Sequence, residues 1–288
     1  MLEKDNTKVY VNGEFFLKKE ASISVFDRGF LFSDSVYEVT AVIDGKLVDW
    51  QEHFARLERS LDHLDIVNNF NEEDFYKIQK KLINQNELKE GLCYIQITRG
   101  FGERDFNFGN KLFLPTVVMF TQEKSILNNP ATKAGIKIIT VPDDRWKRRD
   151  IKTTQLLAQS IAKSSAVQKG LDDSLLVQDG FINEGSSSNA FIIKDDHIYT
   201  PSLSNFILGG ITRSTVIEFC KTKNIQIKEQ KIHVDDVMGA QEVFLTSATG
   251  FVIPVIEIDG RPVGNGSVGD KVKEIQKIYL EQIKSKLS

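Results

Sequence analysis

The chain has 288 residues, of which 41% are hydrophobic and 27% charged, and its formal net charge is -3 at pH 7. It is therefore an ordinary globular chain, long enough for one large or two medium domains. The nearly balanced charge gives no reason to expect nucleic acid or an anionic membrane as a partner. Two cysteines, Cys93 and Cys220, exclude a disulfide-rich scaffold and offer no metal-ligand spacing. We expect two buried thiols and no metal site.

No targeting or membrane segment is apparent in the sequence. The opening residues lack the apolar core of a signal peptide, and no apolar run approaches the roughly 20 residues that a membrane-spanning helix needs. We therefore expect a cytoplasmic protein that binds no membrane.

The first 120 residues predict an antiparallel sheet with two helices, an α+β domain. Alternating apolar residues flank Asn12-Gly13 and Asp44-Gly45, a pattern typical of β-hairpins. Two further strands are expected within 91–100 and 111–120. A helix is expected over 50–66, because Phe54, Leu57, Leu61 and Leu64 are spaced by three and four residues, and a second one over 72–86.

Residues 121–135 interrupt the periodicity with Asn, Pro and Gly, and we interpret 121–134 as an interdomain linker. Residues 135–288 predict a second α+β domain. Its expected helices cover 153–170 and 212–222, and its expected strands lie within 136–141, 174–183, 190–200, 242–246 and 250–260.

Three segments rich in small and polar residues are candidates for a ligand site. The first is "NEGSSSNAF" (183–191), which local chemistry alone favours as a solvated loop. The second is Gly209-Gly210 before a helix that contains Thr212, either a capped turn or a cradle for a phosphate. The third is "LTSATG" (245–250), the end of a strand that could line the same site.

A basic segment, "RWKRRDIK" (145–152), contains five cations. With Trp146 as its single aromatic residue, it is typical of a solvated loop rather than of a nucleic-acid surface. Lys152 differs from the other cations because it follows Ile151 and precedes an apolar helix. A buried lysine with a lowered pKa is the type of residue that forms Schiff bases.

Seven motifs in order resemble those of the class IV pyridoxal-phosphate aminotransferases, and among these the enzymes that act on D-amino acids. The similarity runs from Tyr10 to Gly260. The motifs are "DRGFLFSDSVYE", "EHFARL", "ITRG", "DIKTTQLL", "NEGSSSNAF", "GGITR" and "LTSATG". The resemblance implies a two-domain α+β fold, with pyridoxal 5'-phosphate in the cleft between the domains.

The resemblance also implies a role for each matching residue. Lys152, in the C-terminal domain, would hold the cofactor and shuttle the proton. Glu184 would keep the ring nitrogen protonated, and Tyr37 would lie near cofactor and substrate. The other implied cofactor-binding residues are Arg56, which would bind the phosphate, Leu208 behind the ring, and Gly210, Ile211, Thr212, Ser247 and Ala248.

Arg104 matches the arginine that captures the substrate carboxylate in the D-specific enzymes. Those enzymes typically have a histidine two residues later, where this sequence has Phe106. The implied reaction is ping-pong transamination between a D-amino acid, such as D-alanine, and a 2-oxo acid. The implied assembly is a homodimer in which loops of one subunit complete the other's site.

Other functions stay open at this point. Within the family they are a branched-chain L-amino-acid aminotransferase, an aminodeoxychorismate lyase and an (R)-amine transaminase. The (R)-amine activity is favoured by Phe106, which weakens the case for a carboxylate pocket. Outside catalysis, the chain could be a cofactor-free interaction protein whose cations between Arg145 and Lys152 meet an acidic partner.

Overall fold

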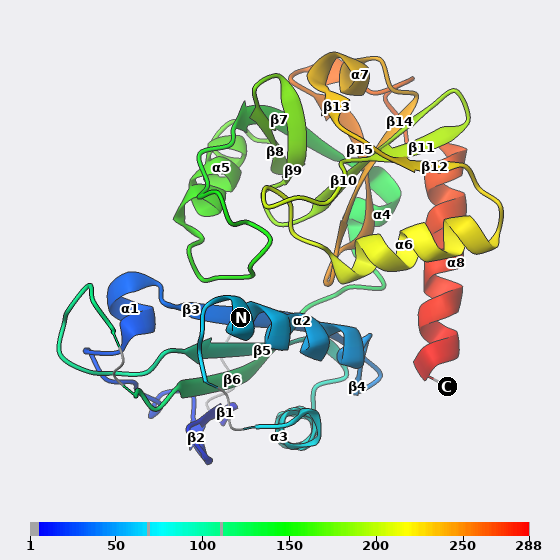
Figure 1. The fold of residues 1–288 in the computed structure, drawn as a ribbon. Helices are drawn as coiled ribbons and strands as arrows, with labels where there is room; N and C mark the ends of the chain where they lie inside the picture. Colours follow the sequence, from blue (N-terminus) through cyan, green and yellow to red (C-terminus); the bar gives the residue numbers. More distant parts are fainter. Residues whose placement is uncertain (1–5, 68–69, 110–111, 288) are drawn as a thin grey trace. The chain divides into compact units, whose positions relative to one another are not determined.

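The computed structural model describes residues 6–67, 70–109 and 112–287, which form two compact units (Figure 1). Unit 1 comprises Met1–Ser125 and Ile151–Gln155, and unit 2 comprises Ile126–Asp150 and Leu156–Ser288. The sequence analysis placed Lys152 in the C-terminal domain, whereas the structure groups residues 151–155 with unit 1. The boundaries at 120/121 and 134/135 stay a prediction. Within the expected linker, the structure has the end of strand β6 and helix α4.

Unit 1 contains a six-stranded antiparallel sheet with the strand order β2-β1-β6-β5-β3-β4. The strands are β1 (Lys8–Val11), β2 (Glu14–Leu17), β3 (Ser35–Ile43), β4 (Lys46–Leu47), β5 (Glu90–Thr98) and β6 (Thr116–Glu123). Both predicted hairpins are confirmed, because β1 pairs with β2 and β3 with β4. Their turn residues Asn12-Gly13 and Asp44-Gly45 all have positive φ, as this tight turn requires.

Unit 1 also contains the helices α1 (Arg28–Phe32), α2 (Trp50–His63) and α3 (Glu72–Gln85). Helix α2 packs against β3 and buries Phe54, Leu57 and Leu61, which confirms these residues of the predicted apolar face. The helix ends at His63 instead of residue 66, and Leu64 is its half-buried C-cap residue. Helix α3 packs against β1 and β6, and a capping box formed by Asn71 and Asp74 starts it.

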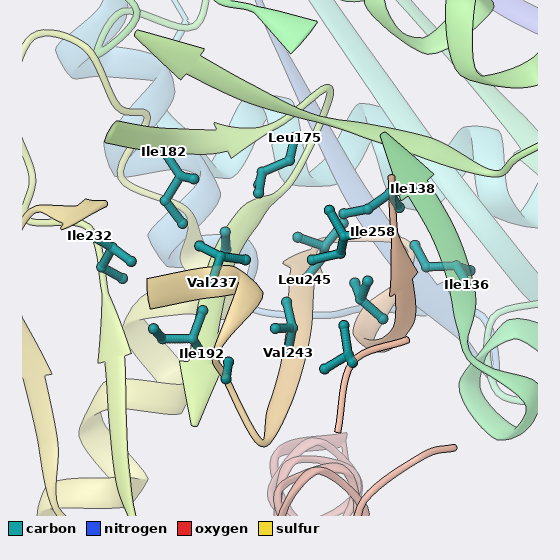
Figure 2. Packing of buried hydrophobic residues seen from close by; sticks show 14 residues of the cluster. Ile136, Ile138, Leu175, Ile182, Ile192, Ile232, Val237, Val243, Leu245 and Ile258 are labelled. Carbon is teal, nitrogen blue, oxygen red and sulfur yellow. The ribbon is translucent and has the colours of Figure 1, made fainter. Parts of the chain in front are cut away.

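Unit 2 contains a ten-stranded mixed sheet with the order β12-β11-β10-β14-β15-β7-β8-β9-β13, in which β16 pairs with β15. The strands are β7 (Ile136–Pro142), β8 (Asp173–Gln178), β9 (Phe181–Gly185), β10 (Asn189–Lys194), β11 (His197–Thr200), β12 (Ile227–Glu229), β13 (Ile232–His233), β14 (Glu242–Ser247), β15 (Phe251–Ile258) and β16 (Arg261–Pro262). Figure 2 shows buried side chains of this sheet, among them Ile182, Ile192 and Leu245, that converge with Val237 in one core.

The helices of unit 2 are α4 (Pro130–Ala134), α5 (Leu157–Val167), α6 (Ile211–Thr222), α7 (Val234–Met238) and α8 (Asp270–Leu287). Helix α8, which lies beside α6 (Figure 1), was not predicted. Its signal is present in the sequence, because Val272, Ile275, Tyr279 and Ile283 recur at helical spacing and are all buried.

Helix α5 begins later than predicted, at Leu157 instead of Thr153. The reason is tertiary: Thr153 forms a bridge with Val36, and the N–H of Thr154 donates to the carbonyl of Ser35. Lys152 therefore does not directly precede the helix. The first residue of the helix does not face the core, since Leu157 is 75% exposed.

Cys93 and Cys220 are both buried and free, as expected. Within residues 6–67, 70–109 and 112–287, no helix combines the length and the apolar character that crossing a bilayer would require.

Candidate active site

Lys152 lies in unit 1 between strand β3 and helix α2. Its carbonyl accepts a hydrogen bond from the N–H of Tyr37 at 3.0 Å, and its own N–H donates to Ser60 Oγ at 3.4 Å. The ammonium group lies 4.2 Å from the centroid of the Tyr37 ring. The structure thus brings together two residues that the sequence analysis singled out, and Lys152 is half-buried.

Arg56 is buried on helix α2 and binds Glu38 of strand β3 with two hydrogen bonds. Its Nε donates to Oε1 of Glu38 at 2.7 Å, and its Nη2 donates to Oε2 at 2.9 Å. His53 Nδ1 lies 2.7 Å from the same Oε2. Ser60 connects this group to Lys152, since its hydroxyl donates to the carbonyl of Arg56 at 2.9 Å.

Sequence reasoning missed Glu38, although a signal existed. An acid that points inward on a β-strand, opposite an arginine of an amphipathic helix, predicts a buried ion pair. Burial alone would raise the pKa of Glu38, but Arg56 and His53 reverse the effect and hold the pKa well below its ordinary value. Glu38 is therefore a carboxylate at neutral pH, and it fixes the orientation of the Arg56 side chain.

The predicted carboxylate-binding residues lie on an exposed loop of unit 1. Arg104 stacks over the rings of Phe32 and Phe106, at 5.4 Å and 5.3 Å from their centroids, and Phe106 is 77% exposed. The buried Arg28 anchors the loop, because its Nη1 donates to the carbonyl of Asp105 at 2.7 Å. The role of Arg104 as a carboxylate trap stays a prediction.

Glu184 lies in unit 2, on strand β9, and its carboxylate is buried. Oε1 accepts a hydrogen bond from Arg145 Nη1. Oε2 accepts hydrogen bonds from Asn189 Nδ2 at 3.1 Å and from the N–H of Leu208 at 3.3 Å. Burial raises the pKa of Glu184, although Arg145 and the Leu208 N–H oppose the rise.

The segment "NEGSSSNAF" is only in part the solvated loop that local chemistry favours. Asn183, Glu184 and Gly185 belong to β9, and Asn189 begins β10, so only the three serines bend the chain. Ser186 Oγ donates to Asp173, which fixes the bend. Among the described residues Ser188 Oγ has no hydrogen-bond partner although it is buried, a feature that often marks a ligand or water site.

The start of helix α6 lies close to this carboxylate. Gly210 is the N-cap residue, no side chain caps the helix, and Thr212 in its first turn is buried. A Cβ atom at Gly210 would lie 2.0 Å from Asn189 Oδ1, so only glycine fits. Asn189 Nδ2 also donates to the carbonyl of Leu208 at 2.9 Å, which ties Leu208 and the helix start to Glu184.

Ser247 and Ala248 lie at the same end of the sheet. Asn189 is the register partner of Thr246, so the end of β14 is adjacent to the start of β10. The hydroxyl of Ser247 accepts a hydrogen bond from the N–H of Gly250 at 3.1 Å and shapes the turn. Within unit 2, all the predicted cofactor-binding residues therefore cluster around Glu184 and Asn189.

The basic segment is not a solvated loop as a whole. The side chains of Arg145 and Arg149 are buried and paired with Asp143, whereas that of Arg148 is more exposed and pairs with Asp150. The interpretation as a solvated loop was therefore wrong for Arg145 and Arg149, because the sequence could not show that Asp143 and Glu184 lie next to them.

The chain belongs to the class IV aminotransferases. The family model "Amino-transferase class IV" matches residues 35–258, a range that contains Tyr37, Lys152 and Glu184.

Relatives within this family can be named individually. A D-alanine aminotransferase of Staphylococcus aureus (strain MSSA476) is 37% identical over 280 residues, which cover 96% of this chain and 98% of that protein. A D-alanine aminotransferase of Bacillus licheniformis is 35% identical over 283 residues, at 96% and 98% coverage. A crystal structure of a T.th. branched-chain amino acid aminotransferase, complexed with N-(5'-phosphopyridoxyl)-L-glutamate, has a TM-score of 0.86 at 26% identity and covers 96% of this chain and 94% of that chain.

Glu38 gives the first testable prediction. Because its pKa is lower in the folded than in the unfolded chain, its ionised form stabilises the fold above the ordinary value of 4.5, and this contribution is lost as the pH falls below it. We expect Glu38→Gln to lower the free energy of unfolding by about 3 to 5 kcal/mol at pH 7, since it removes the buried carboxylate charge that Arg56 and His53 bind. At pH 3 the difference from wild type should be smaller.

Urea denaturation of wild type and Glu38→Gln at pH 7 and at pH 3 measures the loss of stability at each pH. Glu73→Gln, which removes one partner of an exposed ion pair with Lys77, is the matched control and should leave stability unchanged. An equal loss for Glu38→Gln at pH 7 and pH 3 would contradict the assigned ionisation.

Proposed function

We propose that this chain is a pyridoxal-phosphate-dependent transaminase that moves the amino group of a D-amino acid, such as D-alanine, to a 2-oxo acid by a ping-pong mechanism. The observation that carries the proposal is 37% identity to a D-alanine aminotransferase across 96% of the chain. Both proteins are covered almost end to end, so the relation includes every segment that contributes a candidate site residue.

The residues present fit pyridoxal phosphate by their chemistry. Lys152 supplies an amine for a Schiff base, Glu184 supplies a buried carboxylate for the ring nitrogen, and Ser188 offers a buried hydroxyl without a partner among the described residues. When bound, the cofactor supplies an electron sink for the substrate carbanion. In this proposal Lys152 takes the α-proton of the substrate and later gives it back, with Tyr37 beside its amine.

The phosphate is assigned to groups that favour a dianion. The first N–H groups of an α-helix have no intrahelical partner, and at α6 no side chain caps them. In our proposal Gly210, Ile211 and Thr212 bind the phosphate with the turn at Ser247 and Ala248, and Leu208 packs behind the ring. Arg56 adds a charge-assisted contact and is held in orientation by Glu38.

The substrate carboxylate is assigned to Arg104. Its guanidinium lies on an exposed loop, and Phe106 two residues later offers no hydrogen bond to an anion. Phe106 supports a second candidate, an (R)-amine transaminase, because such a donor has no carboxylate to bind. The other members of the family that the motifs fit, branched-chain L-amino-acid aminotransferases and aminodeoxychorismate lyases, have no specific observation in their favour beyond the shared fold.

We also propose that the enzyme is a homodimer. An apolar loop face supports this, formed by segment 23–30 and by 101–114 as far as these residues are described. Its strongly exposed side chains include Val25, Phe26, Phe30, Phe101, Leu112 and Leu114. The two segments are joined by a bridge between Asp27 and Phe101 and by a hydrogen bond from Gly102 N–H to the Phe26 carbonyl. Such a contiguous apolar surface is typical of a subunit interface.

Lys152→Ala should abolish transamination, because both the covalent attachment point and the proton carrier are lost. Borohydride reduction of the holoenzyme followed by peptide mapping identifies the attachment point independently of activity. A pyridoxyl group on the peptide that contains Lys152 is the expected result, and a label on any other lysine would overturn the assignment.

Arg104→Leu should lower kcat/KM for D-alanine by about 10 to 150-fold, the effect of one charge-assisted hydrogen bond of roughly 1.5 to 3 kcal/mol. A simple (R)-amine should be nearly unaffected, and Phe106→His should improve activity with D-alanine. Steady-state measurements of kcat/KM for both variants, with D-alanine and with the (R)-amine, test whether Arg104 binds the substrate carboxylate. Equal losses on the two donors would show that the loop acts only through stability.

A mixing experiment tests the homodimer and the source of Arg104 together. If Arg104 serves the site of the partner subunit, refolding Lys152→Ala with Arg104→Leu should restore activity, because each mixed dimer contains one site with both wild-type residues. About a quarter of the sites in a randomly paired mixture should be intact. A monomer in sedimentation would contradict the homodimer, and a dimer that shows no recovery on mixing would contradict a contribution of Arg104 to the site of the partner subunit.

A further inference from the structure

A chain of buried charges continues from Glu184 into the basic segment. Arg145 Nη1 donates to Glu184 Oε1, while its Nε and Nη2 donate to the two oxygens of Asp143 at 2.8 Å each. The side chains of Asp143, Arg145 and Glu184 are at most 6% exposed. Arg145 is therefore held between two carboxylates and cannot turn to solvent without leaving both.

With Arg149 as a further neighbour of Asp143, the net charge of this buried group is close to zero. Asp143 Oδ2 also accepts a hydrogen bond from Asn183 at 2.8 Å, and Arg149 lies 3.3 Å from Asp143 Oδ1. Burial alone would raise the pKa of Asp143, but Arg145, Asn183 and Arg149 reverse this and lower it. With Asp143 and Glu184 ionised, two negative charges face two arginines.

The hydrogen bonds that Glu184 already accepts leave few free acceptor positions on its carboxylate. A carboxylate has about four acceptor positions, two on each oxygen. Among the described residues Asn189 and Leu208 use both positions on Oε2, and Arg145 uses one on Oε1. The one position left is on the oxygen that also binds Arg145.

We propose that Arg145 is a positioning residue that keeps Glu184 ionised and thereby holds a proton on the pyridine nitrogen of the cofactor. This inference rests on the proposed role of Glu184. One proton is shared between the two groups and can lie on the ring nitrogen or on the carboxylate. Arg145 contacts Glu184 directly, whereas a ring nitrogen bound by Glu184 would lie farther from Arg145.

The sign of the effect follows from these relative distances. Charge interactions weaken with separation, so Arg145 stabilises the carboxylate more than it destabilises the protonated ring. The proton is therefore favoured on the ring nitrogen, where it makes the cofactor a stronger electron sink. Without Arg145, burial of Glu184 would favour the neutral acid and an unprotonated ring.

The ring nitrogen itself can report the proton. We would load wild type and variants with pyridoxal phosphate labelled with ¹⁵N in the ring and record the ¹⁵N chemical shift. Arg145→Met removes the charge at similar length and should move the resonance toward that of the unprotonated ring, with kcat lowered about tenfold or more. Arg148→Met is the matched control, since Arg148 pairs with Asp150 and is 39% exposed, and it should leave the resonance unchanged.

Glu184→Gln separates failure of this inference from failure of the proposed function. If Glu184→Gln does not move the resonance, the role of Glu184 is wrong. If Glu184→Gln moves it and Arg145→Met does not, Glu184 keeps its role and the inference for Arg145 is overturned.

Arg145→Met could fail to fold because it leaves Asp143 buried without its partner. In that case the double variant Asp143→Asn with Arg145→Met replaces the pair by neutral side chains, a change that proteins often tolerate. We expect its resonance to move in the same direction as for Arg145→Met. An unmoved resonance in the folded double variant overturns the proposal.

Discussion

Buried carboxylates paired with arginines are the constraint on which the candidate residues of each unit depend. Glu38 of unit 1 binds Arg56, and Glu184 of unit 2 binds Arg145. Removing an ionised carboxylate from water costs several kcal/mol, so each carboxylate is stable in the protein interior only when it is paired and hydrogen-bonded. The result is rigidity, because an arginine clamped by a carboxylate has few other orientations.

The two pairs differ in whether burial or the neighbouring cations decide the direction of the carboxylate's pKa shift. The effect of Arg56 and His53 on Glu38 outweighs that of burial, so the pKa of Glu38 falls and its carboxylate stays charged. Ser60 connects Arg56, which binds this carboxylate, to Lys152. At Glu184, burial outweighs Arg145 and the pKa rises. A titratable carboxylate suits the proton sharing that we propose for Glu184, with Arg145 favouring its ionised form, whereas a firmly ionised carboxylate suits a structural anchor.

Much of the fold could be predicted because it depends on local pattern. The turns at Asn12-Gly13 and Asp44-Gly45 need positive φ, and the alternation around them needs one buried face, so the hairpins follow from the sequence. Helix α2 follows in the same way from its apolar spacing. Helix α5 began late because the preceding residues pair with strand β3, a contact between segments more than a hundred residues apart that no local pattern encodes.

The sequence by itself determined which residue types are available for the chemistry: Lys152, Glu184 and Arg56 in motifs that match the family, and glycine at the start of α6. Only the tertiary structure decided how they are held. It placed Lys152 against Tyr37, turned Arg56 onto Glu38 and buried Arg145 between Asp143 and Glu184. The physical reason is that a local pattern encodes backbone conformation and a buried face, whereas the charge state and orientation of a side chain depend on partners that chain folding brings together from distant positions.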